Sequence, residues 1–236
     1  MSFEQAGDHL AIALPGGTAL FTTRHGGVSD GPFASLNLGL WTDDDAARVW
    51  ENRARVARLS GGRIAQARQV HGTRIVAADP GAVEEADGQV TAERGVAAMA
   101  LTADCLPIAL VAPEGVAMLH AGWRGLADGV IAAGVAALRG LGAGEVAAAI
   151  GPGAGPCCYE VGEDVARRLQ ARFGTAVVRD GRADLWLCAR RALEAAGAAE
   201  VAVAGECSIC NPGRYFSHRR DRGVTGRQGV VGVLDG

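Results

Sequence analysis

Three side chains of this 236-residue chain could hold a metal ion together: His71, Cys105 and His120. Each lies close to a glycine or proline at which a predicted strand bends or ends, so the three could meet at one rim of a sheet. One thiolate and two imidazoles suit zinc, and three protein ligands leave a fourth position for water or substrate. The spacing leaves two alternatives open: a buried cysteine with unrelated histidines, or Cys105 as a nucleophile with a histidine as its base.

Arginine is the only side chain with a permanent positive charge, because the 23 Lys and Arg residues of the sequence are all Arg. Without lysine the chain cannot form a Schiff base, and arginine must supply any cationic anion site. Arg124 precedes a predicted helix whose N-terminus could bind an anion. Four more arginines lie between residues 219 and 227. Either group could hold a phosphate through bidentate hydrogen bonds, and either could instead be solvated.

The other cysteines could form a second metal site, but their sequence context argues against one. Cys207 and Cys210 form a C-x-x-C motif, and Cys157 and Cys158 are adjacent. A vicinal pair is poorly shaped for chelation and there is no second C-x-x-C motif, so we expect no structural metal here. A redox role is also disfavoured, because no thioredoxin-like segment surrounds the motif. Cys188 lies in a predicted helix and is expected in the core.

The composition argues against nucleic acid and membrane surfaces as partners. The formal net charge is −3 and 21% of the residues are charged, whereas binders of those polyanions carry a basic excess. Residues 1–5 lack the basic and apolar regions of a secretory signal, and no uncharged apolar run reaches the ~20 residues of a membrane span. We therefore expect a cytoplasmic protein whose six cysteines are reduced.

Periodicity predicts the elements that must position these residues. Short runs rich in aliphatic or β-branched residues indicate strands, and apolar residues at helical spacing indicate helices. The predicted strands are 18–23, 69–77, 96–101, 108–111, 116–120, 146–150 and 201–204, and the predicted helices are 45–59, 126–138, 162–173 and 184–196. Strands outnumber helices without alternating regularly with them, which favours α+β layers over a doubly wound sheet. With no repeat or linker, residues 1–236 are expected to form one domain.

Short motifs occur in order along nearly the whole chain. They are TTRHGGVS (22–29), SLNLG (35–39), QVHG (69–72), DGQVT (87–91), TADC (102–105), HAGWRG (120–125), IGP (150–152), CCYEVG (157–162), RRD (219–221) and TGR (225–227). This series resembles the YfiH family, also called laccase-domain or multicopper polyphenol oxidase-like proteins and regarded as purine nucleoside phosphorylases. Family members usually follow SLNLG with a histidine-containing Gly-Asp turn, whereas residues 40–44 here are LWTDD, so we assign that loop no role.

The resemblance implies a layered sandwich of mixed β-sheets flanked by helices, distantly similar to toxin deamidases that use a Cys–His pair. It implies zinc, with His71, Cys105 and His120 as its ligands. The implied activities are phosphorolysis of adenosine, inosine, guanosine and 5′-methylthioadenosine, and deamination of adenosine. Editing of peptidoglycan precursors and copper-dependent polyphenol oxidation are alternatives, although a trinuclear copper cluster needs many more histidines than the five present.

The predicted residue roles follow from this chemistry. Phosphorolysis requires an anion held against the anomeric carbon and a stabilised leaving base, and deamination could use a water activated at the open zinc position. The predicted catalytic residues are Cys105, His71, Asp104 and Arg220. Asp104 would orient groups or relay protons. The predicted substrate- or phosphate-binding residues are Arg24, Asn37, Arg124 and Arg219. The partners are expected to be a small nucleoside and phosphate, and the protein a monomer or small homo-oligomer.

Overall fold

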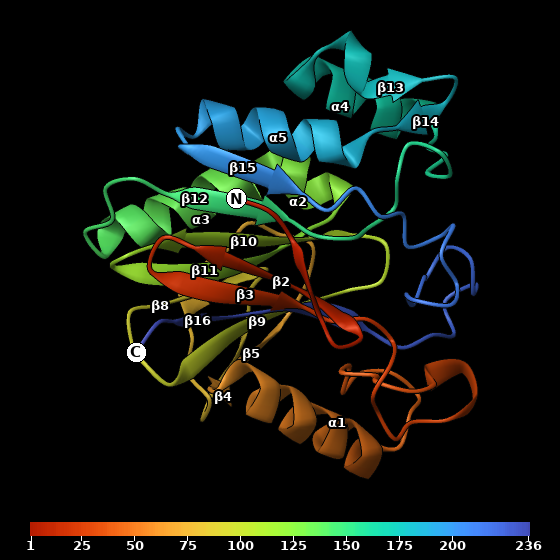
Figure 1. Cartoon of the computed structure of the whole chain (residues 1–236). Helices are drawn as coiled ribbons and strands as arrows, with labels where there is room; N and C mark the ends of the chain where they lie inside the picture. The colour runs from red at the N-terminus through yellow and green to blue at the C-terminus, as the bar shows by residue number, and fades with distance from the viewer.

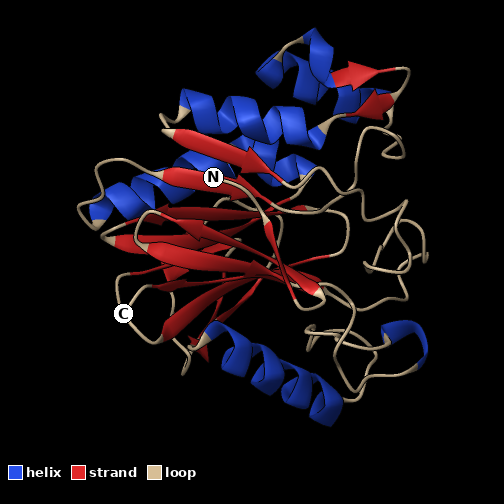
Figure 2. Ribbon diagram, viewed as in Figure 1, coloured by secondary structure: helices blue, strands red, loops and turns tan.

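Two six-stranded β-sheets pack face to face, and helices cover both outer faces (Figure 1). This arrangement is seen in a computed structural model that describes all residues, 1–236. Helix α1 (Ala46–Ser60) covers one sheet, and α3 (Val130–Gly140) and α5 (Leu185–Ala195) cover the other. The short α2 (Trp123–Asp128) precedes α3, and α4 (Glu163–Phe173) packs on α2 and α5. Figure 2 shows the strands gathered between these two helical layers.

The first sheet joins the two ends of the chain. Its order is β1-β2-β3-β16-β9-β4, and only the β4–β9 pair is parallel. The C-terminal strand β16 lies between β3 and β9, so that Val230 pairs with Phe21 on one side and with Ala100 on the other. The strand bounds are β1 Glu4–Ala6, β2 His9–Leu14, β3 Gly17–Phe21, β16 Gln228–Leu234, β9 Val96–Thr102 and β4 Arg63–Ile64.

The second sheet carries the strands that position the candidate ligands. Its order is β15-β12-β10-β11-β8-β6, with parallel pairs at both edges and an antiparallel centre. Every residue of the two central strands, β10 and β11, is buried, as continuous apolar runs covered on both faces require. The strand bounds are β15 Glu200–Val203, β12 Ala147–Ile150, β10 Leu106–Ala112, β11 Gly115–Ala121, β8 Gly88–Thr91 and β6 Ile75–Ala77. Two small pairs complete the strands: β5 (Gln66–Arg68) with β7 (Val83–Glu85), and β13 (Val178–Arg179) with β14 (Arg182–Ala183).

Helix ends follow local sequence signals. The Asp45 side chain accepts a hydrogen bond from the backbone N–H of Ala47 at the start of α1, and Asp184 does the same for Leu187 in α5. Such caps are worth about 0.5–2 kcal/mol each. Gly129 adopts a φ of 102° between α2 and α3, a left-handed conformation that favours glycine. It divides the helix predicted over 126–138 into two.

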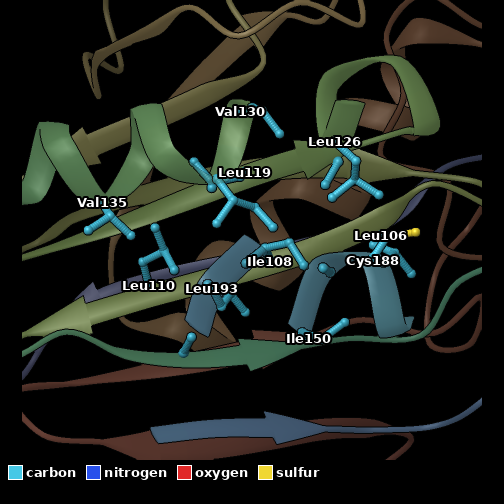
Figure 3. Packing of buried hydrophobic residues seen from close by; sticks show 14 of the residues in the cluster. Leu106, Ile108, Leu110, Leu119, Leu126, Val130, Val135, Ile150, Cys188 and Leu193 are labelled. Atoms are coloured by element: carbon cyan, nitrogen blue, oxygen red, sulfur yellow. The ribbon is translucent and has the colours of Figure 1, made fainter. Parts of the chain in front are cut away.

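The hydrophobic core has three parts, one for each interface between layers. The largest lies between the second sheet and its helices, where Leu110 and Leu119 face Val135 and Leu193 (Figure 3). A second part lies between the two sheets, and a third lies between the first sheet and α1. Cys188 is fully buried in the largest part, as expected. Truncating a leucine in such a site typically costs about 2–5 kcal/mol.

The observed architecture confirms the predicted fold class, a sandwich of mixed sheets flanked by helices. The strand predicted over 69–77 is wrong for most of its length, because only Ile75–Ala77 forms a strand. The preceding backbone instead turns at His71, whose φ is 63°. None of the helices combines the length and the apolar character needed to cross a membrane.

Candidate metal centre and the cavity beside it

The structure brings His71, Cys105 and His120 together at one end of the second sheet. His120 lies in β11 and pairs with Pro107 of β10, while Cys105 lies in the turn that leads into β10. His71 reaches the same point from the loop after β5. The Cys105 Sγ is 3.9 Å from His71 Nε2, and the two imidazole rings have centroids 4.7 Å apart. The three ligand atoms lie within 4.8 Å of one another.

A buried carboxylate, Asp87, holds two of these ligands in place. Its carboxylate accepts hydrogen bonds from the backbone N–H groups of Val70, His71 and Gly72, at 3.1, 2.9 and 2.6 Å. These three bonds explain why this segment turns instead of continuing a strand. Oδ1 of Asp87 also lies 2.8 Å from Nδ1 of His120. A carboxylate partner keeps the proton on Nδ1 and leaves Nε2 free to bind a metal ion. Sequence reasoning assigned Asp87 no role, although it opens the motif 87–91.

The electrostatics of the site favour a thiolate. Burial opposes ionisation of Cys105, but the charge of His120 and hydrogen bonds from His120 and His71 outweigh it and lower the thiol pKa to about 6. Burial likewise opposes a charge on His120, but Cys105 and Asp87 raise the pKa of its imidazole to about 9. The thiolate is the form of cysteine that binds metals.

The donor set fits a single zinc-like ion. A tetrahedral ion with bonds of about 2.0–2.3 Å needs ligand atoms about 3.3–3.8 Å apart, close to the spread seen here. Gly122 leaves the necessary space, because a Cβ at that position would lie 2.9 Å from Cys105 Sγ and 3.0 Å from His71 Cδ2. Two imidazoles and a thiolate also resemble part of a mononuclear copper site. Of the chain's five histidines, two belong to this centre and His218 lines the cavity. The other two, His9 and His25, belong to no second group of possible metal ligands.

A cavity of about 400 Å³ opens beside the three ligands, a volume suited to a small molecule. Its wall combines cationic and aromatic side chains from several loops with few free anionic groups. Arg124 lies over the ring of Trp123 at 4.4 Å, and Arg219 lies over Tyr159 at 5.1 Å. Besides the three candidate ligands, the polar, charged and aromatic residues that line the cavity are Trp41, Thr42, Gln69, Thr102, Asp104, Trp123, Arg124, Tyr159, His218, Arg219 and Arg227.

Two of the predicted residues in this wall, Arg124 and Arg219, present exposed side chains. Asp104 also lines the cavity, but its carboxylate accepts hydrogen bonds from Ser208 Oγ and from the backbone N–H of Arg219, both at 2.7 Å. Asp104 has a φ of 93° and directly precedes Cys105. These contacts make it a positioning residue for the turn that carries the thiol.

Arg24, Asn37 and Arg220 are not among the residues that line the cavity. The Arg220 guanidinium donates to both carboxylate oxygens of Asp221 at 2.8 Å and to two backbone carbonyls. Arg24 donates to carbonyls of two loops and lies over the ring of Phe216. Asn37 is fully buried and cross-links its own loop to the backbone of Arg227. Their polar groups are therefore used in holding loops together.

Several cavity residues were not predicted from the sequence. Trp41, 57% exposed, lines the cavity from the loop at 40–44 that differs from the usual family motif. Arg227 lines the cavity as well, as its third arginine beside Arg124 and Arg219. It lies in the motif 225–227, but no role of its own was predicted for it from the sequence. Thr102 ends β9 with a buried hydroxyl that has no hydrogen-bond partner within the protein. A single aromatic in a variable loop carries no pattern from which its position could be inferred.

Comparison with known proteins places these features in a family context. A family model described as multi-copper polyphenol oxidoreductase laccase matches residues 18–235. Purine nucleoside phosphorylases of Pseudomonas aeruginosa and Deinococcus radiodurans are each 42% identical to this chain, covering 86% and 89% of it and 87% of each relative.

Solved structures agree closely with this one. YlmD from Geobacillus stearothermophilus matches with a TM-score of 0.89 and 37% identity, over 99% of both chains. YfiH from Bacillus licheniformis matches with the same TM-score and 31% identity, again over 99% of both chains.

Proposed function

The chain belongs to the family described as multi-copper polyphenol oxidoreductase laccase, and on that premise we propose that it is a zinc-dependent purine nucleoside phosphorylase that also deaminates adenosine. One observation carries the proposal: a two-histidine, one-cysteine centre borders a cavity that holds three arginines and several aromatic rings. A nucleoside and inorganic phosphate need those groups together. The relatives named purine nucleoside phosphorylase support the same reaction class.

Arg124, Arg219 and Arg227 are the proposed phosphate-binding residues. Guanidinium groups recognise phosphate through paired hydrogen bonds and remain charged at any physiological pH. Arg124 and Arg219 are held against aromatic rings, which limits their freedom before phosphate binds. These residues take over the role predicted for Arg24 and Arg220, which do not line the cavity. Arg219 and Arg227 each also donate to backbone carbonyls through Nη1.

Aromatic faces in the wall suit the purine base. Trp41 presents an exposed indole at the cavity, and stacking of a base on an aromatic ring is worth about 1–3 kcal/mol. The exposed ring of His218 could bond the ribose or the base edge. The cavity volume of about 400 Å³ accommodates a nucleoside with phosphate beside it.

The reaction requires that a phosphate oxygen form a bond to the anomeric carbon while the bond from that carbon to the base nitrogen breaks. The base leaves with the bonding electron pair and takes up a proton. The arginines hold the nucleophile and neutralise its charge, and the aromatic residues orient the base.

His71, Cys105 and His120 would hold the metal ion. A zinc ion held by these residues would supply a Lewis acid. Deamination of adenosine is proposed at the same centre because three protein ligands would leave one coordination position for water or substrate. Asp87 keeps the His120 ring in the metal-binding orientation, and Asp104 positions the turn of Cys105. The five histidines of the chain suit one such centre and not the additional trinuclear cluster of a multicopper oxidase. Because Cys105 must be reduced to serve as a ligand, we propose the cytoplasm as the site of action.

The test is product identification from adenosine with and without phosphate. Phosphorolysis yields adenine and ribose 1-phosphate only when phosphate is present, whereas deamination yields inosine in either case. Cys105→Ala should abolish both reactions and the zinc bound at this centre. Cys188→Ala, which removes a cysteine outside the cavity, serves as the matched control. Unchanged turnover and zinc content in Cys105→Ala would refute the assignment, and oxygen-dependent oxidation of a phenol in place of nucleoside turnover would favour the copper oxidase.

A further inference from the structure

Four cysteines outside the candidate active site bring their sulfurs together. Cys157 and Cys158 lie in the loop after β12, and Cys207 and Cys210 lie in the loop after β15. We propose that these four side chains form a second zinc site, whose function is structural. Their sulfur atoms all lie within 4.8 Å of one another. The Cys210 Sγ is 3.3 Å from that of Cys157 and 2.9 Å from that of Cys158.

The gathering of four sulfurs at one point fits a four-thiolate zinc site better than a single disulfide. Zinc bound to four thiolates at about 2.3 Å holds the sulfurs about 3.8 Å apart. A disulfide uses two of the four thiols, whereas a single ion is bound by all four. The proposal replaces the expectation of no metal here, which rested on the poor chelating shape of a vicinal pair.

The local backbone prepares one of the four sulfurs for a metal ion. Cys207 is buried, with 6% of its surface exposed, and the backbone N–H of Gly155 donates to its Sγ at 3.3 Å. Hydrogen bonds from backbone N–H groups stabilise a thiolate and fix its direction. The C-x-x-C turn is closed by Asn211, whose backbone N–H and side-chain amide both donate to the Cys207 carbonyl.

The adjacent cysteines are also held in a turn. The backbone N–H groups of Cys158 and Tyr159 both donate to the carbonyl of Gly155. Because Gly155 also donates to Cys207, one residue links the two loops at the centre of the cluster. A Cβ at Gly155 would lie 2.6 Å from the ring of Trp186 and 3.2 Å from Cys207 Cβ, so this close approach depends on glycine.

A metal ion here would fasten two loops that form the wall of the active-site cavity. Ser208, inside the C-x-x-C turn, donates to Asp104, the residue before Cys105. Tyr159, next to Cys158, lies under the Arg219 guanidinium. None of the four cysteines lines the cavity. The ion is therefore proposed to position cavity residues without contacting the substrate.

The experiment counts zinc in the full chain after reconstitution with zinc chloride under reducing, anaerobic conditions. Wild-type protein should retain two zinc ions per chain, and Cys105→Ala and Cys207→Ser should each retain one. The variant carrying both substitutions should retain none, and Cys188→Ala should retain two. Cys157→Ser provides a second test at an exposed position, where loss of the thiol leaves the core intact.

A second readout separates the two sites by their ligands. Cobalt in a four-thiolate site gives stronger sulfur-to-metal absorption than cobalt bound by one thiolate, so the intense bands should persist in Cys105→Ala and disappear in Cys207→Ser. Full zinc content in both Cys207→Ser and Cys157→Ser would overturn the proposal. A Cys158–Cys210 disulfide would also overturn it. Such a bond would make the mass of the native protein two hydrogens lower than that of the reduced chain and would protect both cysteines from alkylation. The zinc count in Cys105→Ala does not depend on enzymatic activity, so this proposal can fail or succeed independently of the proposed function.

Discussion

The role of Asp87 yields the sharpest prediction, for the substitution Asp87→Asn. The amide keeps one oxygen, which can accept the N–H groups of Val70 and Gly72 that Oδ2 accepts in the native protein. Its nitrogen would donate where Oδ1 accepted the N–H of His71 and faced His120. If the oxygen serves the loop, the NH₂ group faces Nδ1 of His120, which must then accept a hydrogen bond. The proton moves to Nε2, and that nitrogen can no longer bind a metal ion.

The magnitude follows from the contacts of the carboxylate. Loss of a carboxylate behind a metal-bound histidine typically costs about 10–100-fold in metal affinity. Asp87→Asn should therefore weaken zinc binding at the His71–Cys105–His120 centre by that range. Asp87→Ala also removes the acceptor of three loop N–H groups. Because residues 70–72 are exposed or half-buried, water can replace part of the lost bonding. The alanine variant should thus lose zinc affinity and about 1–3 kcal/mol of stability in total.

The assay is a competition titration of zinc against a chromogenic chelator, paired with urea unfolding of the metal-free protein. It is best run in Cys207→Ser, where the proposed four-cysteine site does not contribute. Asp180→Asn provides the matched control, since Asp180 is exposed and its φ of 50° is tolerated by asparagine. Wild-type zinc affinity in Asp87→Asn would refute the reasoning about the tautomer, and an unchanged unfolding midpoint in Asp87→Ala would refute the structural role.

Four further substitutions test separate parts of the site. Trp41→Ala should raise KM for the nucleoside about 5–100-fold, the equivalent of about 1–3 kcal/mol of stacking, while leaving zinc content unchanged in metal analysis. Arg124→Gln should raise KM for phosphate about tenfold or more, with little effect on deamination, because charged hydrogen bonds are worth about 1.5–3 kcal/mol. Gly122→Ala should reduce zinc binding in the same competition assay, since its Cβ would lie 2.9 Å from Cys105 Sγ. Burial raises the pKa of Asp221, but hydrogen bonds from Arg220 and Thr225 outweigh this and lower it. The ionised carboxylate therefore adds stability at neutral pH that is lost as pH falls through the lowered pKa, and urea unfolding should show the wild-type advantage over Asp221→Asn vanish in acid.

Local patterns in the sequence predicted the elements that have strong periodicity. Helices α1, α4 and α5 and the hairpin β10–β11 lie close to the predicted ranges, because capped apolar stripes and continuous apolar runs are local signals. The strand β16 was missed: its glycines at 229 and 232 weaken the pattern, and its partners β3 and β9 lie far away in sequence. The family resemblance, confirmed by the match over residues 18–235, carried the sandwich architecture further than periodicity could.

The candidate site divides in the same way. The types of His71, Cys105 and His120 indicated a metal centre, but their convergence depends on strand register and on a carboxylate that turns the loop of His71. Neither is visible in spacing. Arginine counts likewise indicated an anion site without distinguishing the arginines that line the cavity from those that do not. Arg220 lies next to Arg219 in sequence, yet Asp221 engages its side chain.

Strands and loops position different residues of the site, and this difference suggests what a metal ion in the four-cysteine cluster would do. The ligand His120 is fixed by the central strands of a buried sheet, whose backbone is hydrogen-bonded on both sides. Two of the arginines proposed to bind phosphate, Arg219 and Arg227, extend in contrast from irregular segments. A loop without sheet partners holds a side chain less accurately than a strand does. Arg219 in particular depends on Tyr159 beneath it and on Asp104 at its backbone N–H. Since the two cysteine-bearing loops carry Tyr159 and the Ser208 that bonds Asp104, a cross-link between them constrains the cation without entering the cavity. The rigidity that the sheet gives to the metal ligands would in this way be supplied to the phosphate ligand by a second ion.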